Sequence, residues 1–429
     1  MMEEKVMNRW LVVMGAVMVQ MCLGAIYAWS VFTGALQEAG WTAAQTQVVF
    51  SVALVSYALS MVGAGFKLNV VGPRKMAILG GLILGTGYII AGLFGGTNFW
   101  MLLIFIGIVG GTGIGVGYVV PIAVGMRWFP DKKGLITGLA VAGFGLGAML
   151  WVKLAGTTGN LIANFGLPTT FVILGVLFAV FVTIGGLFMV FPPEGWLPEG
   201  YVPETGEAGS TQVAGVEYGA GEMVKTPQFW MIFFTFAFLA SAGLMSIGLM
   251  QLYPMEALMN NGMDRASAVA VAGTAMAVFF SIANALGRVA WGSISDILGR
   301  KNSLIILAFT QGLGVMAFTY MAGTPMLLYI GAALIGFNFG GTLSLFPTLT
   351  ADTFGSQNVG RNYPLVFLAY GAGALLGPNL GGVMGGMGNF ALAFTICGVL
   401  CIMGGVLTVL LRPPRRCENV ENCAEMEAA

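Results

Sequence analysis

SIANALGRVAWGSISDILGRK, residues 281–301, places a single arginine, Arg288, inside an uncharged apolar segment about twenty residues long. A cation in membrane hydrocarbon costs roughly 2.5–3.5 kcal/mol even on the scale derived from insertion experiments. Such a residue normally faces a bundle interior or a water-filled cavity, and it has a partner there. Our hypothesis is that the partner of Arg288 is a bound anion that does not belong to the chain.

The composition is that of a helical membrane protein. Of the 429 residues, 57% are hydrophobic and 8% are charged, and the mean hydropathy is +0.88. Because roughly 25% of the residues in a soluble domain are charged, an ordinary soluble fold is excluded. The 66 glycines favour tight packing, since small residues let membrane helices approach one another closely.

Twelve apolar segments, in two sets of six, are long enough to cross about 30 Å of hydrocarbon. They are expected near residues 10–33, 47–66, 76–94, 99–126, 135–155, 168–191, 228–252, 266–292, 303–322, 326–346, 362–384 and 388–411. We therefore predict an all-α membrane protein with twelve transmembrane helices in two six-helix repeats. The predicted units are an N-terminal bundle (1–191), a linker (192–227), a C-terminal bundle (228–411) and a tail (412–429).

Twelve spans place both ends of the chain on one side of the membrane, and the positive charges indicate which side. Of the 18 Lys and Arg residues, all but Lys153, Arg265 and Arg288 fall on the side of the termini. Positive residues accumulate in cytoplasmic loops, so we expect both termini in the cytoplasm. The glutamates of the linker do not oppose this orientation, because acidic residues contribute little to it.

A short loop motif occurs once in each half. The first copy contains Gly65, Asn69, Gly72 and Arg74, and the second, about 227 residues later, contains Asp296, Gly299 and Arg300. Both copies follow the second span of their half. Many transporters are built from such internal repeats, and their substrate sites lie near the midplane between the repeats.

The repeated loop resembles that of the major facilitator superfamily, although the first copy has Asn69 where that family carries an acid. Four further segments resemble the oxalate/formate antiporter family, a relative of the monocarboxylate transporters: GAIYAWSVF (24–32), RWFPDKKGLITGL (127–139), EMVKTPQFW (222–230) and RNY (361–363). The resemblance covers the whole chain. It implies transport of small organic anions across a bacterial inner membrane without a cofactor.

Arg288 matches the arginine with which that family holds a substrate carboxylate. The planar guanidinium suits a carboxylate, which it can bind with two hydrogen bonds, and no Asp or Glu within the spans can serve as its counter-ion. Alternatively, Arg288 reaches toward the cytoplasm, where Asp296 lies about 12 Å further along the helix. Asn284, one turn earlier on the same face, either orients the guanidinium, donates to the substrate, or packs between helices.

The eleventh span favours one class of acid over another. In the oxalate carriers this span supplies a lysine near the position of Tyr370, whereas residues 362–384 of this chain contain no Lys or Arg. Oxalate carries two charges, and each charge left unpaired in low dielectric costs several kcal/mol. A lone Arg288 therefore favours a monocarboxylate such as lactate, pyruvate, formate or acetate, with Tyr370 donating a neutral hydrogen bond.

The resemblance also implies an aromatic lining for the site. Tyr27 and Tyr118 keep hydroxylated aromatics of the oxalate carriers, Phe144, Phe339 and Phe367 stand where those carriers have Tyr or Trp, and Leu343 replaces another aromatic. A lining with fewer polar groups suits a short acid with an apolar end. The alternative for each phenylalanine is simple packing in a membrane protein.

A secondary transporter is the favoured class of function. An enzyme would need paired carboxylates, a nucleophile with its base, or a metal cluster within the membrane, and the sequence offers none of these. A membrane sensor of organic acids is the alternative from another class, and oxalate:formate exchange is the alternative among transporters.

No Asp, Glu or His lies within the spans to relay protons. An empty site would bury an unpaired cation, so we expect the carrier to reorient loaded, by anion exchange or by symport with a proton. The expected partners are a small carboxylate, with a proton in the case of symport, and the lipid bilayer. We expect a monomer that binds no nucleic acid and no metal.

Overall fold

The computed structural model describes residues 7–130, 133–156, 158–193, 196–198, 217–355 and 358–412, and within these ranges its regular elements are all helices. Twelve helical spans are long and apolar enough to cross a membrane, which confirms the predicted all-α class and the number of spans. Most of the predicted linker and the tail after Arg412 lie outside the described residues, so the proposed division into four units stays a prediction.

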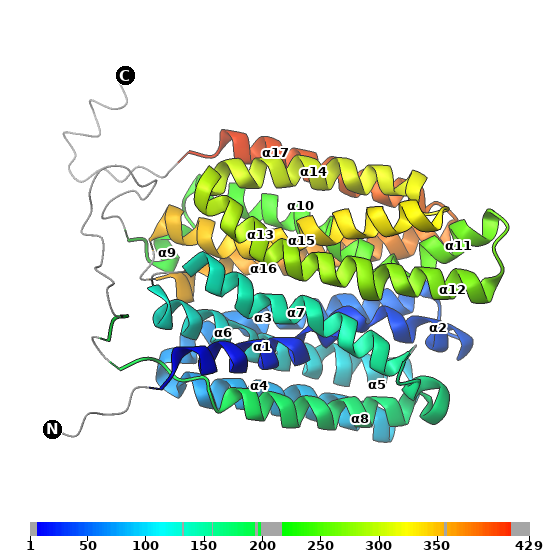
Figure 1. Ribbon diagram of the computed structural model, residues 1–429, viewed down its shortest axis with the longest axis horizontal. Coiled ribbons are helices and arrows are strands. Elements are labelled where there is room, and N and C mark those ends of the chain that lie inside the picture. Colours follow the sequence, from blue (N-terminus) through cyan, green and yellow to red (C-terminus); the bar gives the residue numbers. More distant parts are fainter. Residues whose placement is uncertain are drawn as a thin grey trace.

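The first six spans form one layer of the molecule, the lower one in Figure 1. They consist of α1 (Arg9–Leu23) with α2 (Ser30–Glu38), α3 (Ala43–Val71), α4 (Pro73–Ile90), α5 (Phe99–Leu102) with α6 (Gly111–Trp128), α7 (Lys133–Ala155) and α8 (Leu161–Gly186). The helix α1 begins at the end of the bundle where α17 finishes, on the left of Figure 1. We call this end the terminal face.

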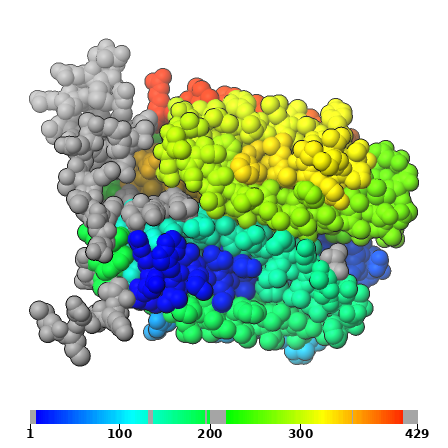
Figure 2. Space-filling view, viewed as in Figure 1, coloured from blue at the N-terminus to red at the C-terminus, as the bar shows by residue number. Residues whose placement is uncertain are grey.

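The second six spans form the upper layer. They consist of α10 (Pro227–Leu249), α12 (Arg265–Thr274) with α13 (Ser281–Leu298), α14 (Arg300–Met321), α15 (Pro325–Phe354), α16 (Val359–Gly386) and α17 (Phe390–Leu410), while α9 (Ala220–Met223) and α11 (Leu252–Asn260) are short connecting helices. Figure 2 shows the two layers in contact along the length of the molecule on the side facing the viewer.

In two spans the α-helix is interrupted close to predicted site residues. In the first span, Gly24–Ala28 forms a 3₁₀ turn between α1 and α2, and Tyr27 lies in this turn. In the eighth span, Ala275–Phe280 forms a π-helical turn immediately before α13. Such departures from the α-helix often mark hinges or functional sites. Both predicted segments, GAIYAWSVF and the stretch at residue 281, therefore begin at a local change of helix geometry.

Several helices extend beyond the predicted spans. The span predicted near 326–346 is the helix α15, which continues to Phe354, and the span predicted near 47–66 is α3, which runs from Ala43 to Val71. Hydropathy marks only the apolar part of a helix, whereas its backbone hydrogen bonds continue through polar residues at the membrane surface. The predicted boundaries are corrected accordingly.

Close packing of α13 on α15 fixes the segment that carries Arg288. A Cβ atom added at Gly287 would lie 1.9 Å from the carbonyl oxygen of Phe337 in α15, and one added at Gly340 of α15 would lie 2.0 Å from the carbonyl oxygen of Asn284. Contacts this short between backbones require small residues at the helix interface. The two glycines therefore determine how closely the part of α13 that carries Asn284 and Arg288 packs against α15.

The substitution Gly287→Ala is expected to destabilise the protein by about 1–3 kcal/mol, because a methyl group there forces α13 and α15 apart. Gly273→Ala, in the same span, is the control, since a Cβ there meets no atom within 4 Å. Thermal unfolding of the detergent-purified proteins, followed by tryptophan fluorescence, measures the difference. Equal melting temperatures for the two variants would contradict the proposed packing.

Candidate functional site

Arg288 is fully buried, with 0% of its surface exposed, at the contact between the two halves. Its Nε donates to Oδ1 of Asn284 at 3.1 Å, and its Nη1 donates to the carbonyl oxygen of Val141, in α7 of the other half, at 2.8 Å. Its Nη2 makes no hydrogen bond in the described structure. The guanidinium is thus held by neutral dipoles, and one of its two terminal nitrogens is unbound.

The interpretation in which Arg288 reaches toward Asp296 is wrong. Asp296 pairs instead with Arg300, whose Nη2 lies 2.5 Å from its carboxylate. Arg288 turns away from the terminal face because its hydrogen-bond acceptors, Asn284 and Val141, lie in the centre of the bundle. Asn284 both orients the guanidinium and bridges helices, since its Nδ2 donates to the carbonyl oxygen of Gly336 at 3.2 Å.

An aromatic cluster surrounds the guanidinium. The ring of Phe144 lies 5.5 Å from Cζ of Arg288, within the range of a cation–π interaction, and meets the ring of Tyr27 edge-on at 4.9 Å. The hydroxyls of Tyr27 and Tyr370, one from each half, are 2.7 Å apart and share a hydrogen bond. The contact between the halves at this level is therefore made of aromatic rings and hydroxyls.

The structure brings most of the predicted site residues together. Tyr27, Tyr118, Phe144, Phe339, Phe367 and Tyr370 belong to one network of ring contacts, and Asn284 and Arg288 lie against it. Leu343 is buried in the same core, one turn after Phe339 on α15. Each of these nine side chains is at most 2% exposed, so the site is closed to solvent in this conformation.

Sequence reasoning missed two tyrosines of this cluster. Tyr57 of α3 packs against the rings of Tyr118, Phe144, Phe367 and Tyr370. The only feature of the sequence that could have indicated Tyr57 is its position in the middle of an apolar span.

The second missed residue is Tyr363, which packs on Phe367. Its hydroxyl is buried and makes no hydrogen bond in the described structure. The same signal would also have selected Tyr320, which is 87% exposed, so it could not have identified the cluster by itself.

The two copies of the loop motif share a backbone turn but differ in charge. Gly72 and Gly299 have φ of 86° and 82°, a conformation that glycine adopts without strain. In the second copy, Arg300 pairs with Asp296 and also with Asp352, at 3.4 Å, at the end of α15.

In the first copy, Asn69 accepts a hydrogen bond of 2.9 Å from Arg127 at the end of α6. Arg74 is exposed, and Gly65 packs on Gly360 and Pro364 of the other half. The second copy therefore balances one cation with two acids, whereas the first joins a cation to a neutral amide.

Comparison with known proteins places the chain among membrane transporters. A family model described as the Major Facilitator Superfamily matches residues 10–279 and 262–422. The chain is 30% identical to the "Uncharacterized MFS-type transporter YhjX" of Escherichia coli (strain K12) over 86% of each chain. It is 25% identical to the oxalate:formate antiporter of Oxalobacter formigenes over 95% of this chain and 92% of that protein. It is 23% identical to apicoplast pyruvate carrier 1 of Toxoplasma gondii over 84% of this chain and 81% of that protein.

The substitution Arg288→Met is expected to leave the melting temperature unchanged or to raise it, because it removes a buried cation that has no anionic partner. Arg300→Met is the matched control. It removes the cation that pairs with Asp296 and Asp352, so its melting temperature should fall. A fall for Arg288→Met as large as that for Arg300→Met would mean that Arg288 serves stability and not a ligand.

Proposed function

Because the chain belongs to the major facilitator superfamily, whose members are membrane transporters, we propose that it is a secondary carrier of small monocarboxylates in which Arg288 holds the carboxylate. The two six-helix halves would move against each other and open the site to one side of the membrane at a time. Since Arg288 and the tyrosine pair connect the halves, their contacts would change with each such movement.

The observation that carries this proposal is the unbound Nη2 of Arg288 in a site closed to solvent. An arginine has five N–H donors, and among the described residues only the Nε and Nη1 of Arg288 find acceptors. The buried hydroxyls of Tyr118 and Tyr363 likewise make no hydrogen bond in the described structure. A bound carboxylate would satisfy these donors and neutralise the cation.

The charge of the site favours one carboxylate over two. Arg361 is the only basic residue in the sequence of α16, and it lies outside the aromatic cluster, at the terminal face. Tyr370 occupies the inner part of this helix and bonds to another hydroxyl. If Arg288 is the one cation in the site, a dianion pairs only one of its two charges, and the unpaired charge costs several kcal/mol.

The relatives support both candidate substrate classes. Pyruvate, named for the Toxoplasma relative, is a monocarboxylate of the proposed kind. Oxalate:formate exchange, named for the Oxalobacter relative, is the second candidate, and the absence of a lysine in residues 362–384 disfavours it. A sensor that binds the acid without moving it is the alternative from another class.

The burial of Arg288 also bears on coupling. When the carrier closes without substrate, Arg288 is buried without an anion, which costs free energy. A bound carboxylate pairs with the cation and removes this cost. We therefore propose that the carrier exchanges acids or moves an acid together with a proton. With the positive residues concentrated at the terminal face, we propose that this face is cytoplasmic in a bacterial inner membrane.

The first test is exchange of labelled lactate, pyruvate, formate, acetate and oxalate in proteoliposomes. A monocarboxylate should exchange in the wild type, and Arg288→Met should lower the rate on the order of a hundredfold or more, because charge-assisted hydrogen bonds contribute roughly 1.5–3 kcal/mol each. Arg265→Met is the control, since Arg265 forms only an exposed ion pair with Glu38 at 3.8 Å. Exchange of oxalate in the absence of any monocarboxylate exchange would contradict the substrate class.

The second test concerns the number of cations. Tyr370→Lys places a second positive charge near Arg288, so it should lower monocarboxylate exchange at least tenfold and raise the ratio of oxalate to monocarboxylate transport. Tyr370→Phe is the control, because it removes the hydrogen bond to Tyr27 without adding a charge. If both variants change this ratio alike, the number of cations does not set the substrate class.

A further inference from the structure

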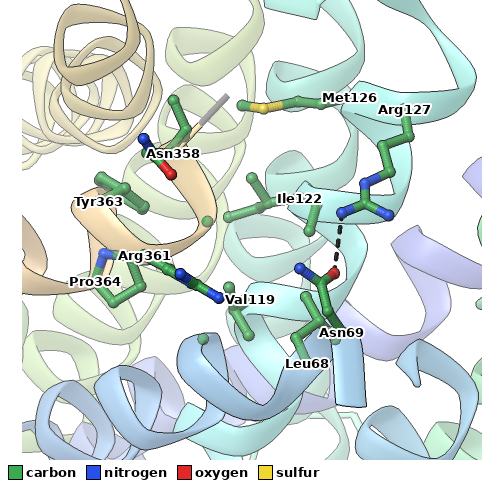
Figure 3. A pocket seen from close by; sticks show the side chains of 14 residues that line it. Leu68, Asn69, Val119, Ile122, Met126, Arg127, Asn358, Arg361, Tyr363 and Pro364 are labelled. Atoms are coloured by element: carbon green, nitrogen blue, oxygen red, sulfur yellow. Dashed lines mark hydrogen bonds between the residues drawn. The ribbon is translucent and has the colours of Figure 1, made fainter. Parts of the chain in front are cut away.

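A cavity of about 340 Å³ lies between the two halves at the terminal face (Figure 3). The ends of α3 and α6 form one wall, and the beginning of α16 forms the other. This volume is at the lower end of the range of roughly 300–1,000 Å³ for small-molecule pockets. Among the described residues, its lining contains two arginines and no acid.

The two arginines approach the cavity from opposite halves, Arg127 from α6 and Arg361 from α16. Arg127 donates to the neutral amide of Asn69 at 2.9 Å and lies over the ring of Phe191 at 3.8 Å. It forms no ion pair with the described residues. Arg361 forms no ion pair with the part of the chain that the structure describes. Gly360, near the positive N-terminal end of α16, also lines the cavity.

The departure of the first loop motif from the family pattern determines this charge. In the second copy Asp296 and Asp352 balance Arg300, whereas the first copy has Asn69 in place of the acid. Asn69 lines the cavity, and Asp296 does not. The motif copy without its acid is thus the one that faces the space between the halves.

Tyr363 connects the lining of the cavity to the aromatic cluster around Arg288. This side chain lines the cavity, is 2% exposed and has a hydroxyl without a hydrogen-bond partner. Its ring lies 5.7 Å from that of Phe367, which belongs to the aromatic cluster. Tyr363 therefore contacts both the cavity and the aromatic cluster.

We propose that this cavity is a second carboxylate-binding site, where the substrate is captured on its way between the terminal face and Arg288. Asn69 makes the site possible, because an acid at this position would balance the charge of Arg127. The inference rests on the proposed function, since the ligand is the same carboxylate. The arginines at the cavity remain in contact with solvent, so the site raises the local concentration of anions and the rate of capture.

The test is Asn69→Asp, which keeps the acceptor for Arg127 while adding a negative charge, together with Arg361→Gln. Exchange is measured in proteoliposomes whose orientation is selected with a C-terminal tag, using the carboxylate that the wild type exchanges best. With substrate varied on the terminal side, both variants should raise KM on the order of three- to tenfold. The maximal rate and the KM on the opposite side should stay unchanged, and 0.5 M salt should reduce the effect by screening.

Lys67→Gln is the matched control, since it removes an exposed positive charge from the same end of α3 without lining the cavity. A KM for Lys67→Gln that rises as much as for Arg361→Gln would assign the effect to general surface charge and overturn the proposal. Unchanged KM values for Asn69→Asp and Arg361→Gln, with normal wild-type exchange, would overturn it and leave the proposed function intact. Absence of carboxylate exchange by the wild type would reject the proposed function, and this inference with it.

Discussion

A buried cation without an anionic partner is the constraint on which the centre of this protein depends. The guanidinium of Arg288 is held by one side-chain amide, one backbone carbonyl and the face of one aromatic ring. Such neutral groups only partly replace the water that a cation loses on burial. The remaining deficit is the physical basis of the proposed preference for a small anion, and it would link binding of that anion to any movement that encloses the site.

The contacts between the halves are made largely of neutral groups. Besides the hydrogen bond between Tyr27 and Tyr370, Gln47 of α3 donates to the carbonyl oxygen of Gly248 at 3.2 Å. The ion pair between Glu38 and Arg265 at the opposite face is exposed on both sides, and pairs of this kind contribute about 0–1 kcal/mol. Neutral hydrogen bonds contribute about 0.5–1.5 kcal/mol each. Contacts of this strength can break and re-form during a transport cycle.

The interior of each half is built differently from the contact between the halves. In the second half, α13 and α15 meet through glycines at distances that leave no room for a methyl group. Arg288 therefore sits on a closely packed pair of helices, while its Nη1 bonds to a carbonyl of the opposite half. This arrangement suits alternating access, because the cation keeps its place in one half while its contact to the other can be exchanged.

Much of this organisation follows from the sequence alone, because it depends on composition within single segments. The twelve spans, the lone arginine in an apolar stretch and the lack of a basic residue in 362–384 are all local properties. Seven further side chains around the site were selected by resemblance. Tyr57 and Tyr363 were missed because the sequence near a tyrosine in a span does not indicate which face of the helix it occupies. Only the tertiary structure decides that question, since partners such as Tyr27 and Tyr370 stand 343 residues apart. The cavity between Asn69, Arg127 and Arg361 likewise exists only where three distant helix ends meet.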